Sequence, residues 1–279
     1  MKEAIRNIAN KLSSLYDARE CNSIARYIVE EISGLSFTDI LVKDTKFSEV
    51  DREKIEEITK RLLDGEPLQY VLGYSYFCDL KICVNNNVLI PRPETEELCR
   101  LIIERERNNS PKILDVCTGS GCIALSLKNG IMNSEVEGVD ISEEALGVAR
   151  INSQECKCDV DFYKYDVIEE SPKITKKYDI IVSNPPYICQ FEKEKMESNV
   201  LDNEPHLALF VSNEKPLVFY DKIAETGLNI LSNGGKLYFE INPLFHNELH
   251  NMLSLKGYSN IEIIKDINER KRFIVCTKT

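Results

Sequence analysis

The sequence has few of the features that mark metal sites and disulfide-bonded folds. It holds only three histidines, and none of its ten cysteines forms a Cys-x-x-Cys pair. His246 and His250 have the spacing of one helix face, but Glu248 between them is misplaced for the metal-binding His-Glu-x-x-His arrangement. We therefore expect no metal site, and cysteines that are scattered, reduced thiols.

Long apolar runs and an excess of basic residues are also missing. No run approaches the roughly 18 apolar residues that a spanning helix needs, and Met1-Lys2-Glu3 leads into an amphipathic pattern instead of a signal-peptide core. The formal net charge is -11, which argues against a broad phosphate-binding surface. We expect a cytoplasmic monomer whose main partner is neither a membrane nor a nucleic acid.

The apolar content that is present suffices for two domains. Of the 279 residues, 43% are hydrophobic, so a sizeable core is possible. In residues 1–70 apolar side chains recur at helical spacing, with capping signals at Ser36 and at Ser48 with Asp51 and a stop signal at Gly34. This pattern predicts a small helical bundle without a catalytic constellation of its own, which we interpret as a substrate-docking domain.

Residues 71–92 change from helical to strand-like patterning. Residues 74–84 are rich in aromatic and β-branched side chains, and three asparagines at 85–87 are typical of a turn before the apolar run 88–90. We expect a β-hairpin that links the two domains. Pro93 then opens a helix with acidic residues in its first turn.

Residues 93–279 alternate between strand and helix patterns, which predicts an α/β fold of the Rossmann-like class. Such alternation gives a mostly parallel sheet with right-handed crossovers. The last two strands lie close together in the sequence, so a terminal strand should pair antiparallel. Strands are expected near 112–117, 136–140, 159–165, 178–183, 236–241, 260–266 and 272–278.

The most informative motif is Asn184-Pro185-Pro186-Tyr187, which follows an apolar run typical of a buried parallel strand. Two prolines cannot continue the strand, so the chain is stiff at the carboxyl end of the sheet, where α/β proteins bind ligands. There Asn184 offers a side-chain amide, Pro185 a carbonyl and Tyr187 a ring face, which together suit a planar NH2 group. A plain proline turn is the simpler alternative.

A second motif is a glycine-containing loop after the first strand of the sheet. Gly119 and Gly121, with Ala124, satisfy the nucleotide-binding pattern G-x-G-x-x-G/A. Asp140 ends the second strand, near the expected distance for a carboxylate on ribose hydroxyls, and Asp166 ends the third, where a carboxylate can meet an adenine amino group. The alternative is a tight turn with helix-capping or solvated acids.

Two nucleoside cofactors fit this loop. A nicotinamide dinucleotide would place its pyrophosphate at the helix N-terminus. S-adenosylmethionine has no phosphate and carries a sulfonium, so the acidic groups around the loop, Asp115 included, suit it better. The motif at 184–187 favours S-adenosylmethionine, because a hydride-transfer enzyme has no need to hold an NH2 group there.

Together, these motifs resemble those of the HemK/PrmC release factor glutamine methyltransferases. The resemblance covers nearly the whole chain, although Cys117 departs from the glycine that is common in the family. Asparagine-proline-proline-tyrosine alone is shared with DNA adenine methyltransferases, whereas the proline-arginine-proline segment is much more specific. The matching segments are Ile90-Pro-Arg-Pro-Glu-Thr-Glu96, Asp115-x-Cys-Thr-Gly-Ser-Gly121, Asn184-Pro-Pro-Tyr187 and Glu204-Pro205 with Ala208-Leu209.

The resemblance implies transfer of the S-adenosylmethionine methyl group to a glutamine side-chain amide nitrogen, leaving S-adenosylhomocysteine. The glutamine would be that of the Gly-Gly-Gln motif in peptide chain release factors. We interpret Asn184, Pro185 and Tyr187 as catalytic, and the same residues with Pro186 as substrate-binding. The candidate cofactor-binding residues are Asp115, Cys117, Thr118, Gly119, Ser120, Gly121, Asp140, Asp166, Val167 and Asn184.

Two other functions stay open at the level of the sequence. A nucleic-acid amino-group methyltransferase would share the asparagine-proline-proline-tyrosine motif, but it would need a basic recognition surface. A non-catalytic nucleotide-binding or docking protein would bind the cofactor without turnover on any release factor.

Overall fold

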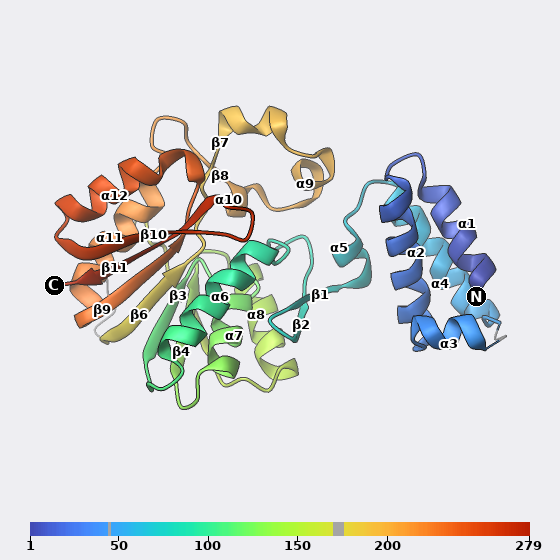
Figure 1. Ribbon diagram of the computed structural model, residues 1–279, viewed down its shortest axis with the longest axis horizontal. Helices are drawn as coiled ribbons and strands as arrows, with labels where there is room; N and C mark the ends of the chain where they lie inside the picture. The colour runs from blue at the N-terminus through green and yellow to red at the C-terminus, as the bar shows by residue number, and fades with distance from the viewer. Residues whose placement is uncertain (44–45, 170–175) are drawn as a thin grey trace. The chain divides into compact units, whose positions relative to one another are not determined.

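The protein forms two compact units in the computed structural model, which describes residues 1–43, 46–169 and 176–279 (Figure 1). The first unit comprises Met1–Gly73 together with Ser198–Asn203. The second comprises Tyr74–Glu197 and Glu204–Thr279. Within the described ranges, none of the helices combines the length and the apolar character needed to cross a membrane.

The first unit is a set of short helices, as its apolar periodicity predicts. Asp17, Ser36 and Ser48 cap the N-termini of three of them, and Ser48 forms a capping box with Asp51. Gly34 ends the second helix with a φ of 65°, a left-handed conformation that glycine adopts readily. The predicted capping and stop signals are thus confirmed. The helices are α1 (Lys2–Leu12), α2 (Ala18–Ser33), α3 (Phe37–Val42), α4 (Glu49–Leu63), α5 (Leu68–Leu72) and α9 (Ser198–Asn203).

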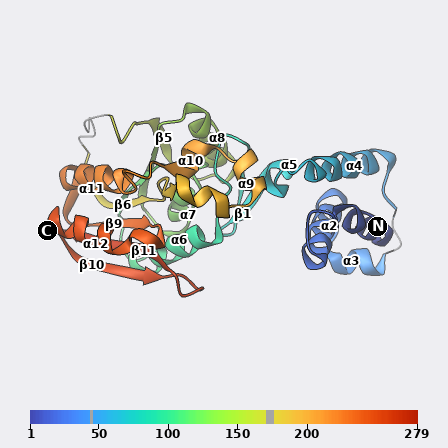
Figure 2. The same cartoon turned by 90° about the horizontal axis from the view of Figure 1, so that it is seen from above.

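Helices α1, α2 and α4 pack against one another around an apolar core (Figures 1 and 2). Leu12, Ile28 and Leu62 are completely buried there. Burying one such side chain stabilises the fold by about 1.5–3 kcal/mol. Asn203 of α9 donates a hydrogen bond to the Gly65 carbonyl (3.1 Å), which ties this later segment to the bundle.

The expected β-hairpin is present in the second unit, but its turn lies earlier than predicted. Strands β1 (Tyr74–Phe77) and β2 (Leu80–Cys83) pair antiparallel around Cys78 and Asp79, whose φ values are 46° and 65°. Two left-handed central residues are typical of a type I′ turn, whose twist matches that of the strands.

The prediction that 85–87 joins two strands is therefore wrong, since residues 88–90 form no strand. The Asn152 side chain accepts from the Cys83 N–H (2.6 Å) and donates to the Cys83 carbonyl (3.0 Å). These two bonds occupy the backbone groups that a continued strand would need.

The central sheet of the second unit has seven strands within the described residues, in the order β10-β11-β9-β6-β3-β4-β5. Strands β5, β4, β3, β6 and β9 run parallel, whereas β11 runs antiparallel to β9 and to β10. The predicted mostly parallel sheet with antiparallel pairing at its end is confirmed. The strands are β3 (Lys112–Val116), β4 (Glu135–Asp140), β5 (Asp161–Lys164), β6 (Tyr178–Ser183), β9 (Leu231–Glu240), β10 (Tyr258–Lys265) and β11 (Lys271–Lys278).

The strand order reverses between β3 and β6, and this reversal positions the site. The chain runs from β3 outward to β4 and β5, and then returns to the other side of β3 as β6 (Figure 1). The connections that follow β3 and β6 therefore lead away in opposite directions. They leave a crevice at the carboxyl ends of these two strands, where open α/β sheets bind ligands.

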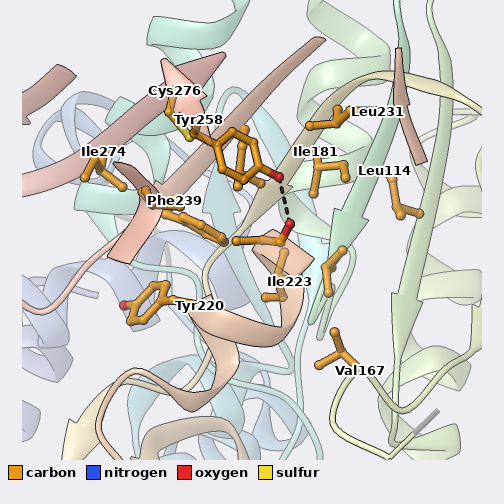
Figure 3. Packing of buried hydrophobic residues seen from close by; sticks show 14 of the residues in the cluster. Leu114, Val167, Ile181, Tyr220, Ile223, Leu231, Phe239, Tyr258, Ile274 and Cys276 are labelled. Atoms are coloured by element: carbon orange, nitrogen blue, oxygen red, sulfur yellow. Dashed lines mark hydrogen bonds between the residues drawn. The ribbon is translucent and has the colours of Figure 1, made fainter. Parts of the chain in front are cut away.

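Helices cover both faces of the sheet. They are α6 (Pro93–Glu106), α7 (Cys122–Gly130), α8 (Glu143–Glu155), α11 (Val218–Ile230) and α12 (His246–Leu255). Residues of α11 and α12 join Ile181, Phe239 and other strand residues in one buried cluster (Figure 3). On the opposite face, the Tyr238 hydroxyl of β9 donates to the Glu106 carboxylate of α6 (3.3 Å). Successive residues of β9, Tyr238 and Phe239, thus contact helices on opposite faces of the sheet, as the period of a strand requires.

Candidate active site

The loop between β3 and α7 turns tightly at the carboxyl end of the sheet. Cys117, Gly119 and Gly121 have φ values of 61°, 53° and 80°, a left-handed region that glycine tolerates best. This conformation explains why glycine is the expected residue at position 117. A Cβ atom on Gly121 would lie 2.9 Å from the ring of Phe162, so glycine is also required there for space.

Asp115 lies behind the loop and is completely buried. Its Oδ2 accepts from the Thr118 hydroxyl (2.5 Å) and from the Ala124 N–H (3.2 Å). Within the described residues its Oδ1 has no partner, and neither has the buried hydroxyl of Ser120. Burial raises the pKa of Asp115 to about 7 because the charged form is poorly solvated there.

Asp140 ends β4 as predicted, whereas Asp166 lies two residues beyond the end of β5 at Lys164, and both hold backbone groups. Asp140 accepts from the N–H groups of Gly119 (2.9 Å) and Ser142 (3.0 Å), and thereby fixes the glycine loop. Asp166 accepts from the N–H groups of Ile168 (2.9 Å) and Glu169 (3.2 Å). These bonds are the ones that the capping alternative predicts. They do not exclude a ligand, because Asp140 and Asp166 also line the cavity described below.

The segment at 184–187 leaves the sheet where predicted. Strand β6 ends at Ser183, whose hydroxyl donates to the Val116 carbonyl (2.5 Å) and joins the ends of β6 and β3. The Asn242 side chain donates to the Tyr187 carbonyl (3.1 Å). The two prolines are buried, whereas Asn184 is partly exposed. The turn is thus held at its start by β3 and at its end by Asn242.

Two residues that the sequence did not single out hold the side chains of this turn. The Asn184 carboxamide nitrogen donates to Thr95 Oγ1 (3.0 Å), and the Thr95 hydroxyl donates to the Glu240 carboxylate (2.6 Å). The Tyr187 hydroxyl donates to the other oxygen of Glu240 (3.0 Å). Burial raises the pKa of Glu240, while the two hydroxyl bonds and the nearby Arg272 charge oppose that rise.

A cavity of about 570 Å³ joins the loop to the turn. Asp115, Gly121, Pro185 and Tyr187 are not part of its wall. Further lining residues that the sequence did not single out include Thr95, Tyr165 and Phe219. The predicted site residues that line it are Cys117, Thr118, Gly119, Ser120, Asp140, Asp166, Val167, Asn184 and Pro186.

The rim of the cavity joins the two other segments that carried the family resemblance. Arg92 lines the cavity and forms an ion pair with Glu204 (2.5 Å), whose side chain is 1% exposed. The other oxygen of Glu204 accepts from the Ile90 N–H (3.2 Å). The segments at 90–96 and 204–209 are therefore in direct contact at the site.

Comparison with known proteins identifies the family of this chain. A model described as the methyltransferase small domain matches residues 95–208, and one described as the PrmC N-terminal domain matches residues 3–73. The release factor glutamine methyltransferase of Bacteroides thetaiotaomicron is 42% identical to this chain over 272 residues, which cover 97% of this chain and 98% of that protein. The chain belongs to the release factor glutamine methyltransferase family. The family member of Flavobacterium psychrophilum is 39% identical and covers 94% of each chain.

Solved structures agree with this family at the level of the fold. A methyltransferase from Pyrococcus furiosus matches with a TM-score of 0.54 at 18% sequence identity, over 80% of this chain and 98% of its own. At this identity the likeness shows the shared fold alone. As a family member, the protein is a methyltransferase that depends on S-adenosylmethionine.

The residues present fit this cofactor. Acidic side chains of Asp140, Glu144, Asp166 and Glu169 line the cavity together with Arg92, whose charge is already matched by Glu204. An acidic wall suits a sulfonium cation better than the phosphates of a dinucleotide. Ser120 also lines the cavity, and its buried hydroxyl has no partner among the described residues. A buried polar group of this kind is stabilised when a ligand supplies its hydrogen bond.

Proposed function

We propose that this protein methylates the side-chain amide nitrogen of the glutamine in the Gly-Gly-Gln motif of peptide chain release factors. The observation that carries the proposal is the position of Asn184. It lines the same cavity as the glycine loop, and its carboxamide nitrogen is already bonded to Thr95. Its Oδ1 has no partner among the described residues, so it is available to accept an N–H bond from a substrate amide.

The proposed methyl transfer requires the turn at 184–187 to position a weak nucleophile. An amide nitrogen is a poor nucleophile because its lone pair is delocalised into the carbonyl. When bound, S-adenosylmethionine would supply an electrophilic methyl group. The N–CH3 bond would form as the S–CH3 bond breaks and S-adenosylhomocysteine leaves, and the nitrogen would then release one of its two protons to solvent. Asn184 Oδ1 accepts one N–H bond of the glutamine amide from the cavity wall, and the Pro185 carbonyl accepts the other, although Pro185 itself does not line the cavity. Together they orient the amide nitrogen and stabilise the positive charge that grows on it.

In this proposal Tyr187 supports the substrate amide through its aromatic ring. Its hydroxyl is held by Glu240, which fixes the direction of the ring. Tyr187 does not line the cavity itself, and we propose that its ring face packs on the plane of the substrate amide where the glutamine side chain reaches Asn184. The candidate cofactor residues remain those of the loop, Asp140 at the end of β4, Asp166 and Val167 just beyond β5, and Asn184. Asp115 and Gly121 act from behind the cavity wall, by shaping the loop.

We also propose a division of labour along the chain. Residues 1–70 dock the release factor, residues 71–92 link the two domains, and residues 93–279 carry the methyltransferase site. The match of residues 3–73 to the PrmC N-terminal domain supports this division. A cytoplasmic location follows from the proposed substrate, since release factors act on ribosomes, and the proposal includes a monomeric enzyme.

The substrate can be tested directly by methyl transfer. The protein is incubated with labelled S-adenosylmethionine and separate pools of release factor, DNA and RNA. We expect label only in the release factor, on one glutamine side chain by mass spectrometry. We expect none when that glutamine is replaced by alanine. Label in DNA or RNA instead would support the nucleic-acid alternative, and cofactor binding without transfer to any pool would support a non-catalytic protein.

The docking role can be tested with one exposed apolar residue of the first unit. Val42 is 80% exposed at the end of α3. We expect Val42→Asp to raise KM for full-length release factor several-fold, and to leave KM for a short Gly-Gly-Gln peptide unchanged. The matched control is Leu255→Asp, at a residue that is 90% exposed in the second unit. Equal KM effects of both substitutions would contradict a specific docking role for residues 1–70.

A further inference from the structure

Four polar side chains beside the cavity form one continuous chain of hydrogen bonds. The hydroxyls of Tyr187 and Thr95 donate to the two carboxylate oxygens of Glu240, at 3.0 Å and 2.6 Å. The Asn184 carboxamide nitrogen donates to Thr95 Oγ1 at 3.0 Å. Thr95 and Glu240 are only 3% and 1% exposed, so water competes little for these bonds.

Glu240 sets the direction of every bond in this chain. In the structure it accepts from both hydroxyls, which is the pattern of an ionised carboxylate, because that group has no proton to donate. A hydroxyl has a single proton. Once the proton of Thr95 points at Glu240, its oxygen can only accept from Asn184. Asn184 must therefore turn its NH2 group to Thr95, and its Oδ1 faces away from Thr95.

We propose that Thr95 and Glu240 are positioning residues that hold Asn184 with its oxygen, and not its NH2 group, toward the substrate amide. The inference rests on the proposed function, in which Asn184 accepts an N–H bond from a glutamine side chain. The two ends of an asparagine amide have nearly the same shape, so their hydrogen-bond partners decide the orientation. A flipped Asn184 would set N–H donors against the N–H donors of the substrate.

The effect of this orientation is largest in the transition state. Positive charge grows on the substrate nitrogen as the new bond forms, and it strengthens an N–H bond to an oxygen acceptor. The same charge is repelled by an NH2 group. Losing the orientation should therefore lower kcat more than it raises KM.

The test uses the full-length enzyme with release factor at saturating S-adenosylmethionine. Thr95→Val removes the hydroxyl but keeps the shape, and we expect kcat to fall about 10- to 100-fold with KM within about threefold. Thr95→Ser keeps the hydroxyl and should retain kcat within about threefold. The matched control is Thr226→Val, at a threonine of α11 that is 7% exposed and lies outside this chain of bonds, and its kcat should be unchanged.

A second variant keeps the proposal falsifiable if Thr95→Val loses its cooperative unfolding transition. Glu240→Gln keeps the shape of the side chain but adds an N–H donor at position 240. Thr95 can then accept from residue 240 and donate to Asn184, so the Asn184 amide is free to flip. We expect a fall in kcat of about 3- to 30-fold, with the dissociation constant of S-adenosylmethionine by calorimetry close to that of the wild type.

The outcomes separate this inference from the function on which it rests. Wild-type kcat in both Thr95→Val and Glu240→Gln would overturn the inference, and so would equal losses in Thr95→Val and Thr95→Ser. Asn184→Ala is measured in parallel. A slow Asn184→Ala enzyme beside normal Thr95 and Glu240 variants leaves the proposed function standing without the positioning role. Normal turnover in Asn184→Ala would remove the role of Asn184 itself.

Discussion

The glycine loop and the turn at 184–187 face the same cavity but are built in different ways. The loop takes its shape from its own left-handed residues and from Asp140, which is 21 residues from Gly119. The turn takes its side-chain orientation from residues much farther along the chain, since Thr95 is 89 residues from Asn184. The loop, which we propose holds the cofactor, is thus set by local backbone conformation, and the turn, which we propose binds the substrate, is set by distant polar contacts.

The largest effect that we expect on stability lies on the loop side, at Asp115. Its pKa is raised to about 7 in the fold, against about 3.9 in an unfolded chain. The folded protein therefore holds a proton that the unfolded chain has lost between these values, and Asp115 costs stability as the pH rises from about 4 to about 7. Asp115→Asn cannot ionise, and it should be more stable than the wild type by up to about 4 kcal/mol at pH 8.

The difference in unfolding free energy between Asp115→Asn and the wild type should vanish toward about pH 4. There the Asp115 carboxyl is protonated in the folded protein and partly protonated in the unfolded chain. Urea unfolding of both proteins from pH 4 to pH 8, without cofactor, measures it. A stability difference that stays constant over this range would show that Asp115 titrates normally and that the loop does not desolvate it.

On the reacting side, the largest expected effect is on turnover. Asn184→Ala removes an acceptor whose bond is strongest in the transition state, so kcat should fall about 10²-fold or more. The dissociation constant of S-adenosylmethionine should change by less than about fivefold, because Asn184 is only one of the candidate cofactor residues and those of the loop are untouched. Single-turnover kinetics and calorimetry give the two numbers. A variant that loses cofactor binding but keeps its turnover at saturation would reverse the roles that we assign to the two segments.

A smaller effect distinguishes required glycines from replaceable ones. Gly121→Ala must place a Cβ in a left-handed conformation and against the Phe162 ring, and we expect a loss of about 2 kcal/mol in unfolding free energy. Gly147 lies within α8 with open space around its Cα, so Gly147→Ala should gain about 0.5–1 kcal/mol. Thermal unfolding of both variants checks the pair. A stabilised Gly121→Ala protein would contradict the assigned loop conformation.

The contrast between local conformation and distant contacts also explains which features the sequence could predict. The apolar runs around Leu114 and Ile181 predict buried strands, and the two glycines predict the tight loop, because these signals act over a few residues. The hairpin turn was missed because three asparagines at 85–87 are a stronger turn signal than Cys78-Asp79, yet the latter pair adopts the left-handed conformation.

The polar contacts of the site are harder to predict. Glu240 ends β9 directly after the apolar run 237–239, which signals a buried partner, but that partner is Thr95, 145 residues earlier. Arg92 and Glu204 both lie in segments that carried the family resemblance, while their ion pair depends on how the fold closes over 112 residues. Local patterns give the residue types of such a site, and only the tertiary fold decides which of them meet.

The most direct test of the central claim is a double-mutant cycle on kcat with Thr95→Val and Asn184→Ala. If Thr95 acts on catalysis only by orienting Asn184, its substitution has no further effect once Asn184 is alanine. We therefore expect the double variant to match Asn184→Ala within about threefold. Losses that multiply in the double variant would contradict the claim that Thr95 works through Asn184.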